Sequence, residues 1–336
     1  MSNDTSTTEP QTIIDIYNHV TPPKFKDALC DVLPKDSPWI SNMARFPVFS
    51  DMEQRIKDME QKAGIADYKQ VITIAHSLGT TADPPTAAKL AQLGNDGMAE
   101  IVKKYPDKFV AAVACLPLND MDAALKETDR AINELELKGI LINTPVADKP
   151  LDSPEFIPLY EKMAKYDLPI WIHPQRTPAF SDYKSEEVSK YQVNMAYGWP
   201  YESTVAMTRL AVSGILEKYP SLKFIIHHGG AMIPFFAHRI SLTDVDTTGM
   251  PNIYAKRTKP MIEYMKMFYA DIANIPAGAV RLSFEFFGTD HMVFGTDYPY
   301  GPPLSETIGY IGELGIGKEE QKKFFYTNCK TMLNLP

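Results

Sequence analysis

Short apolar, β-branched runs alternate along the chain with segments whose apolar residues recur at helical spacing. The apolar runs predict eight strands, at residues 12–20, 70–77, 108–117, 138–146, 168–174, 222–230, 268–274 and 292–299. The segments between them predict helices, among them 51–64, 83–106, 120–137, 156–166, 203–220 and 319–335. Because strands that are apolar on both faces need cover on both sides, eight such units favour a closed parallel (β/α)₈ TIM barrel, an α/β fold, over an open sheet.

Two segments do not fit this repeat. Residues 21–50 are rich in Pro, Phe and Trp, and residues 175–200 are rich in Ser, Tyr and Lys. They follow the first and fifth strands, so we expect inserted loops over the C-terminal mouth of the barrel. Residues 1–11 are polar, and we expect a disordered N-terminal tail before a single domain over residues 12–336.

Composition narrows the class of protein. The chain has 336 residues, of which 44% are hydrophobic, and a net charge of -8. This charge argues against nucleic acid or an anionic membrane surface as the main partner, because both select for clustered Lys and Arg. The three cysteines are scattered and indicate neither a disulfide framework nor a thiolate zinc site. Without a signal peptide or a long apolar run, we expect a cytoplasmic protein that acts on a small molecule.

Polar residues gather at the C-terminal ends of the predicted strands. Five of the seven histidines lie there, and an aspartate ends the eighth strand; these residues are His19, His76, His173, His227, His228 and Asp297. In a barrel these ends meet at one mouth, where imidazole nitrogens and a carboxylate form a pocket suited to Zn, Mn or Fe. Taken alone, a strand-end histidine is more often structural than a ligand, and for His76 the structural interpretation is favoured.

Strand alternation refines the prediction for the stretch IDIYNH. Asp15, Tyr17 and His19 should share one face and point into the lumen, whereas Ile14 and Ile16 take the other.

The same alternation applies to the sixth strand. His227 and His228 cannot both face inward while that strand stays regular, so one of them should be structural or support a ligand.

Several stretches of the chain resemble a known family. The phrases IDIYNH, PLDSPEFIPLYEKMAKYDLPIWIHP, FIIHHGGAMIPFFAHRI and MVFGTDYP are similar to the amidohydrolase-2 branch of the amidohydrolase superfamily. That branch includes α-amino-β-carboxymuconate-ε-semialdehyde decarboxylase and γ-resorcylate and 5-carboxyvanillate decarboxylases, as well as hydrolases. The resemblance covers roughly residues 12–335 and implies a distorted TIM barrel with one divalent metal, zinc by resemblance, at the strand ends.

The resemblance also implies roles for individual residues. The second histidine of the family's HxH motif falls on His19 and the strand-five ligand on His173. The catalytic histidine of strand six falls on His228, and the final aspartate, a ligand and catalytic residue, on Asp297. The arginine that grips a substrate carboxylate, often across a homodimer contact, falls on Arg239.

Tyr17 stands where the family has the first histidine of HxH. A phenolate is a harder ligand than imidazole, so ligation by Tyr17 would shift the preference from Zn toward Fe or Mn. Alternatively, its hydroxyl bonds a metal-bound water. The site could also hold a second ion, completed by Asp15, His76 or His227.

The remaining residues indicate how a substrate would be bound and how protons would be moved. His228 is a natural acid/base because imidazole titrates near neutral pH. Arg239 and Arg176 could each grip a carboxylate, although Arg176 could equally form a surface ion pair. Trp199 could line the pocket or pack in the core.

Three classes of function stay open. The first is a non-oxidative decarboxylase of an aromatic or conjugated carboxylic acid. The second is a metal-dependent hydrolase of an amide, lactone or thioester. The third is an altered, inactive barrel that associates with an active paralogue in a hetero-oligomer. A dinuclear Fe or Mn enzyme is a further alternative, which would support oxidative or unusual hydrolytic chemistry.

Overall fold

Parallel strands form the inner layer of the protein. The computed structural model describes residues 12–62, 67–244 and 257–336. Its strands are β1 (Thr12–His19), β2 (Asp67–Thr73), β3 (Phe109–Ala112), β4 (Ile140–Thr144), β5 (Ile170–Pro174), β6 (Phe224–Ile226) and β7 (Tyr269–Ala270). They pair in the orders β1-β2-β3 and β4-β5-β6-β7, and every pair is parallel.

Isolated parallel bridges connect these two sheets into a closed barrel. Ala114, just after β3, pairs with Ile140 of β4. On the other side, the segment 292–299 bridges β7 at Met292 and β1 at Tyr298. The expected TIM barrel is therefore confirmed.

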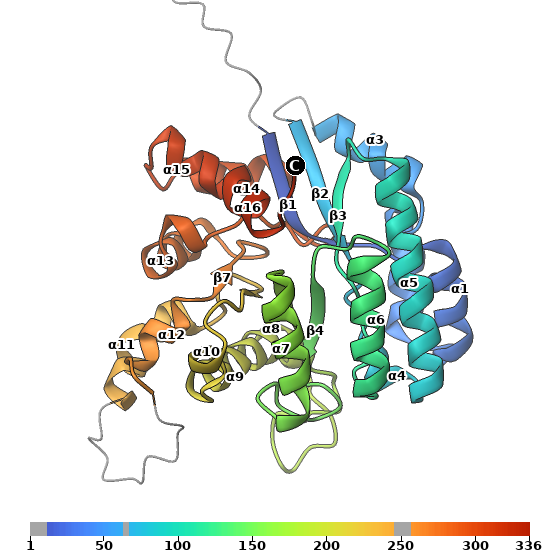
Figure 1. Ribbon diagram of the computed structural model, residues 1–336, viewed down its shortest axis with the longest axis horizontal. Helices are drawn as coiled ribbons and strands as arrows, with labels where there is room; N and C mark the ends of the chain where they lie inside the picture. Colours follow the sequence, from blue (N-terminus) through green and yellow to red (C-terminus); the bar gives the residue numbers. More distant parts are fainter. Residues whose placement is uncertain (1–11, 63–66, 245–256) are drawn as a thin grey trace, which may run out of the picture.

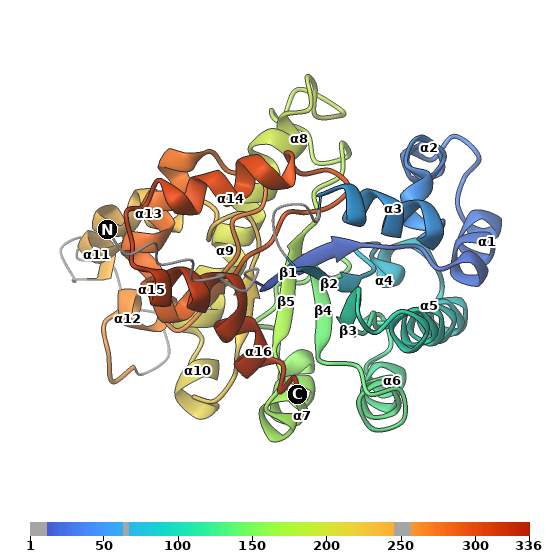
Figure 2. The same cartoon turned by 90° about the horizontal axis from the view of Figure 1, so that it is seen from above.

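Helices surround the strands on the outside (Figures 1 and 2). They are α1 (Pro23–Val32), α2 (Pro38–Arg45), α3 (Met52–Lys62), α4 (Leu78–Thr81), α5 (Pro84–Lys104), α6 (Met121–Asn133), α7 (Ile157–Tyr166), α8 (Val193–Ala196), α9 (Gly198–Val212), α10 (Ile215–Lys218), α11 (Ile233–Asp244), α12 (Met261–Met265), α13 (Ala277–Phe287), α14 (Leu304–Gly312), α15 (Lys318–Lys322) and α16 (Asn328–Met332). Short 3₁₀ turns occur at Pro47–Phe49, Pro154–Phe156 and Thr289–His291, and a π-helical turn at Lys323–Thr327 joins α15 to α16. Local sequence fixes several helix starts: Asp83 and Asp120 each cap the helix that follows, α5 and α6, through a side-chain oxygen.

The expected eighth strand is not a continuous strand. Phe294 accepts a hydrogen bond from Ile16, and Tyr298 accepts one from His19, which attaches the segment to β1. Between them, Asp297 has a φ of 63°, which lies outside extended geometry. The backbone turns there, so the segment closes the barrel through separate contacts and not as a ladder.

The two segments that did not fit the repeat differ in structure. Residues 21–50 are not a plain loop, because prolines at the first positions of α1 and α2 start two helices. Residues 175–200 are mostly irregular and contain the short α8. Both inserts reach the mouth of the barrel: Trp39 packs on His76, and Trp199 packs on His173.

The alternation expected for β1 is wrong in one respect. β1 carries one residue more than β2 between Asp15 and Asn18, which is a β-bulge. Ile14, Ile16 and Tyr17 consequently lie together in the cluster inside the barrel, although alternation placed the two isoleucines opposite Tyr17. The extra residue resets which side chains face the lumen.

The lumen below the mouth is filled by apolar side chains. Trp171 of β5 is fully buried there, and its indole Nε1 donates to the carbonyl of Ile16 at 3.2 Å. Cys329, Met332 and Leu333 belong to the same cluster and close the barrel from the C-terminal end of the chain, which lies near the start of β1 (Figure 1).

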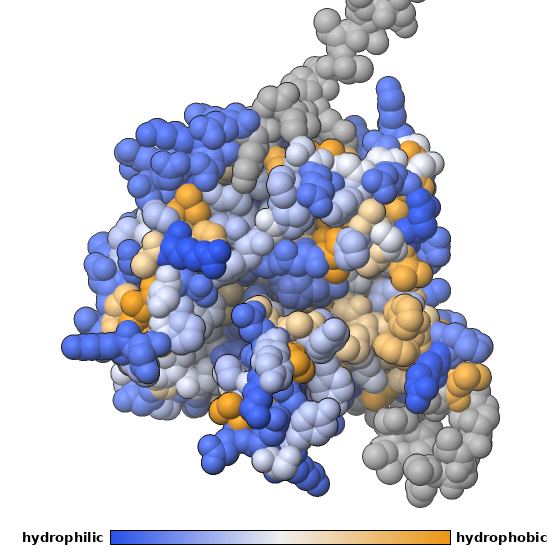
Figure 3. All heavy atoms as spheres, turned by 180° about the vertical axis from the view of Figure 1, so that it is seen from behind, coloured by the Kyte–Doolittle hydropathy of each residue, from blue (hydrophilic) through white to orange (hydrophobic). Residues whose placement is uncertain are grey.

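The surface is mainly hydrophilic on the face seen in Figure 3, with hydrophobic residues in small groups. Among the described residues, no helix is both long enough and apolar enough to cross a bilayer. The predicted N-terminal tail, residues 1–11, lies outside the described residues.

Candidate metal centre

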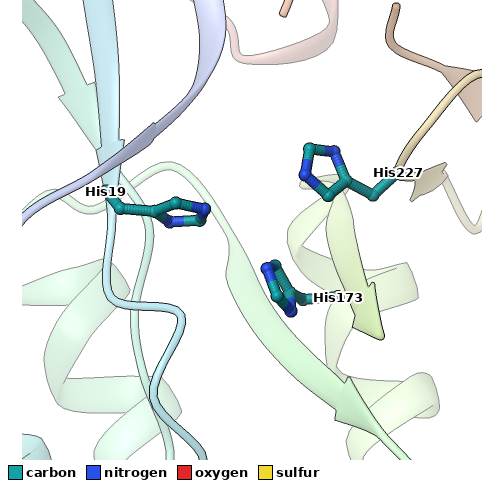
Figure 4. A group of neighbouring side chains, drawn as sticks. All are labelled: His19, His173 and His227. Carbon is teal, nitrogen blue, oxygen red and sulfur yellow. The ribbon is translucent and has the colours of Figure 1, made fainter. Parts of the chain in front are cut away.

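Three histidines meet where β1, β5 and β6 end. His19 closes β1, His173 lies near the end of β5, and His227 directly follows β6. Figure 4 shows their rings facing a common space. One nitrogen from each ring lies within 4.8 Å of the others, and all three residues are buried. His227, His228 and Asp297 form a second group by the same measure.

The hydrogen bonds of His19 and His173 fix which ring nitrogen carries the proton. Nδ1 of His19 lies 3.0 Å from the hydroxyl of Thr73, which itself donates to the carbonyl of Asn18. That hydroxyl must therefore accept from His19. Nδ1 of His173 lies 2.7 Å from the carbonyl of Pro174, which can only accept. In both neutral rings, Nε2 is left with a lone pair.

The protonated nitrogen of His227 is assigned in the same way, from its hydrogen bond. Its Nδ1 lies 2.5 Å from Oδ2 of Asp271, so Nε2 is again the free nitrogen. Oδ1 of Asp297 lies 2.7 Å from Nε2 of His19 and 3.5 Å from Nε2 of His227. A carboxylate oxygen facing imidazole lone pairs is repelled unless a cation lies between them. The cluster therefore fits a metal ion, and a proton takes that place when no ion is bound.

Electrostatics at the cluster agree with this picture. Burial raises the pKa of Asp297, but the hydrogen bond from His19 and the charges of His19 and His227 outweigh it and hold the pKa well below its usual value. Burial lowers the pKa of His227, whereas the charge of Asp271, the hydrogen bond to it and the nearby charge of Asp297 raise it to about 9. Burial and the neighbouring histidines hold the pKa values of His173 and His228 well below normal.

His228 adopts a left-handed backbone, with a φ of 61°. Because β6 ends at Ile226, strand alternation no longer applies, and the rings of His227 and His228 lie 3.8 Å apart at the same site. The N–H of His228 donates to Asp271 at 3.0 Å. Gly230 follows with a φ of 78°, and a Cβ there would meet the ring of Phe287 at 2.5 Å, so this turn requires glycine.

Tyr17 packs inside the same cluster. Its ring stacks on that of His227 with centroids 3.8 Å apart and an interplanar angle of 16°. Its hydroxyl is buried and has no hydrogen-bond partner among the described residues. Burial, followed by the charges of Asp271 and Asp297, raises the pKa of this phenol well above its usual value.

Two residues suggested for a second ion lie apart from this cluster. Both carboxylate oxygens of Asp15 accept hydrogen bonds, from Thr296, Tyr68 and the backbone of Tyr17. His76 bonds Thr81 at 2.8 Å and packs on a tryptophan of α2. Burial lowers the pKa of His76 to about 4.

The predicted substrate-binding residues differ in position. Arg176 forms an ion pair with Glu202 at 2.5 Å, so its guanidinium already has a carboxylate partner. Trp199 lies against His173, with ring centroids 5.7 Å apart, and its indole nitrogen donates to the carbonyl of Arg176. Arg239 is exposed on α11, outside the buried cluster.

Sequence reasoning missed two polar residues of the site. Asp271 orients His227, and Asn274 donates to Oδ2 of Asp297 at 2.5 Å. Both follow the short strand β7. The rule that pointed to His19 and His173, a polar residue at the end of an apolar run, would also have pointed to them.

Comparisons with known proteins identify the family and several relatives of the chain. A family model described as amidohydrolase matches residues 14–335. The chain is 28% identical over 285 residues to a 2-amino-3-carboxymuconate-6-semialdehyde decarboxylase of Dictyostelium discoideum, covering 84% of this chain and 74% of the relative. It is 26% identical to a gamma-resorcylate decarboxylase of a Rhizobium species, with 85% and 90% covered. A solved 5-carboxyvanillate decarboxylase of Novosphingobium aromaticivorans, complexed with manganese and 4-hydroxy-3-methoxy-5-nitrobenzoic acid, superposes with a TM-score of 0.81 at 22% identity, covering 97% of this chain and 96% of that one.

Proposed function

The chain belongs to the amidohydrolase family, and from this membership we propose that it is a metal-dependent, non-oxidative decarboxylase of an aromatic or conjugated carboxylic acid. The observation that carries the proposal is the convergence of imidazole Nε2 atoms on one carboxylate oxygen of Asp297. The two curated relatives described above are decarboxylases of such acids. This supports the choice of decarboxylation over hydrolysis.

We assign His19, His173 and Asp297 as metal ligands. Tyr17 and His227 face the same space, and each is a candidate for a further position on the ion. When bound, a divalent ion neutralises negative charge and holds oxygen atoms of the substrate. Imidazole and carboxylate ligands suit Zn, Mn and Fe, and manganese is the ion in the solved relative.

The reaction needs a proton at one carbon atom. When the bond between the carboxyl group and the substrate carbon breaks, CO₂ leaves and the bonding electrons stay on that carbon, which then takes a proton. His228 is the proposed carrier of this proton, because its ring lies beside the cluster and its Nδ1 has no partner among the described residues. An imidazole can take a proton from solvent and deliver it to that carbon.

Aromatic side chains next to the cluster suit a flat substrate. The ring of Tyr300 lies 6.3 Å from that of His19, and Trp199 of the insert 175–200 packs on His173. Such rings stack favourably on an aromatic acid. We propose that they form the walls of the substrate pocket.

The cation that grips the substrate carboxylate is proposed to be Arg239 of a second copy of the chain. Arg176 is less suited, because Glu202 already neutralises it. On α11, Phe235 and Phe236 next to Arg239 are 72% and 41% exposed, which is apolar area that a homodimer contact would cover.

A direct assay tests the proposal. Metal-free protein is reloaded with Mn²⁺, Zn²⁺ or Fe²⁺, and CO₂ release is measured from dihydroxybenzoic acids, 5-carboxyvanillate and aminocarboxymuconate semialdehyde. We expect release only from loaded protein, with loss of metal and activity in His173→Ala and Asp297→Ala. The surface variant Lys165→Ala, on α7, is the control and should match the wild type. Turnover of amides or lactones without any CO₂ release would refute decarboxylation, and full metal content in both variants would refute the ligand assignment.

A further inference from the structure

Asp271 and His227 form a pair that is completely buried beside the proposed ion. Oδ2 of Asp271 lies 2.5 Å from Nδ1 of His227. Its other oxygen accepts the backbone N–H groups of His228 and Ala273, each at 3.0 Å. Three donors thus hold the carboxylate, which cannot rotate without losing them. The His227 ring is fixed in the tautomer that carries its proton on Nδ1.

The opposite nitrogen of this ring points into the cluster. Nε2 of His227 is buried and has no hydrogen-bond partner among the described residues, which is costly for a polar atom. It lies 3.5 Å from Oδ1 of Asp297. Two ligand atoms of a tetrahedral zinc site, each about 2.0–2.1 Å from the metal, are about 3.3 Å apart. The observed separation is therefore already close to that of two ligands on one ion.

Neighbouring rings hold the plane of His227. The ring of Tyr17 stacks nearly parallel on the ring of His227, with centroids 3.8 Å apart. The ring of His228 packs against the His227 ring at the same centroid distance. The ring of Tyr17 therefore acts on His227 by packing. Among the described residues, no carboxylate or backbone group bonds the hydroxyl of Tyr17. The imidazole of His227, in contrast, is held by Asp271.

We propose that His227 is a direct ligand of the metal ion, together with His19, His173 and Asp297, and that Asp271 is its positioning residue. Tyr17 then forms a wall of the site and leaves its place on the ion to His227. This inference rests on the metal dependence proposed above, but not on the reaction. It makes the centre richer in nitrogen, with three imidazoles and one carboxylate.

Pulsed EPR of Mn²⁺-loaded wild-type protein gives the number of directly bound imidazole nitrogens without any substitution. We expect three. Two nitrogens would overturn the proposal, and this measurement holds even if a variant at His227 fails to fold. Failure of the wild type to bind Mn²⁺, Zn²⁺ or Fe²⁺ would overturn it as well.

Variants then identify the third imidazole. In His227→Ala the count should fall to two, with Mn²⁺ affinity at least 10-fold weaker. In Asp271→Asn the count should stay at three while affinity falls about 10- to 100-fold, as expected for a lost orienting carboxylate. His238→Ala, a histidine lost from the surface, should change neither value. An unchanged count in folded His227→Ala would refute the assignment.

Tyr17→Phe tests the alternative ligand. Protein loaded with iron should lack a phenolate charge-transfer band, and Tyr17→Phe should leave the metal affinity within a few-fold of wild type. A visible band that disappears in Tyr17→Phe would give the position to Tyr17 and overturn the proposal. If CO₂ release occurs while His227→Ala keeps three nitrogens, this inference fails and the proposed reaction stands. If three nitrogens are found and no acid is decarboxylated, this inference stands and the proposed reaction fails.

Discussion

Replacing Asp15 tests whether its carboxylate has a structural role or binds the metal ion. Asp15 is fully buried and receives hydrogen bonds from the N–H and hydroxyl of Thr296, the hydroxyl of Tyr68 and the N–H of Tyr17. These bonds join β1 to β2 and to the segment that closes the barrel. In Asp15→Ala at least three buried donors lose their acceptor. At about 1–3 kcal/mol for each, the free energy of unfolding should fall by roughly 3–9 kcal/mol.

The metal content should not change in this variant, because Asp15 lies apart from the three histidines. Urea denaturation followed by circular dichroism measures the loss of stability, and elemental analysis of the folded protein measures the metal. Loss of bound metal at unchanged stability would refute the structural role and restore Asp15 as a ligand.

Asp15→Asn adds a test through pH. Burial raises the pKa of Asp15 from 3.8 to about 6 in the folded protein. The folded state therefore binds this proton more tightly than the unfolded chain, so the contribution of Asp15 to stability is largest at low pH and falls as pH rises from about 4 to 6. About two pKa units correspond to about 3 kcal/mol. The stability of wild type relative to Asp15→Asn should thus decrease by about that amount between pH 4 and pH 7. A difference that increases with pH would contradict this reasoning.

Three further predictions concern the site. His228→Ala should keep its metal and fold but lose about 10²- to 10⁴-fold in turnover, measured as CO₂ release, and near-normal turnover would exclude His228 as proton carrier. Arg239→Ala should raise KM for the acid with little effect on metal content, and sedimentation should show a wild-type dimer; a monomer at micromolar concentration contradicts the shared site. Chelation of the metal should lower Tm by on the order of 5 °C, because a ligand at 100 times its Kd stabilises the folded state by about 2.7 kcal/mol, and an unchanged Tm would show that the ion adds no stability.

Part of the site follows from sequence alone. Apolar runs at regular intervals favour the barrel, because a closed sheet covered by helices buries eight strands that are apolar on both faces. The C-terminal ends of parallel strands meet at one mouth, so the polar residues that follow these runs must gather there. For this reason His19, His173 and Asp297 could be placed together, although almost 300 residues separate the first from the last.

Other features depend on contacts that no local pattern encodes. The bulge in β1 arises from its register against β2, and it placed Ile14 and Ile16 on the side of Tyr17. The backbone turn after Ile226 brings both neighbouring histidines to the site, against the alternation of a regular strand.

The sequence by itself determined the barrel and which strand ends carry polar groups, since both follow from periodic burial along single strands. Only the tertiary structure decided what each polar group does. Asp15 and Asp271 are both buried aspartates on strands or at their ends, yet one ties the barrel together and the other orients His227. The difference lies in which donors other strands bring within hydrogen-bond distance, and that depends on register and backbone turns fixed by packing of the whole chain.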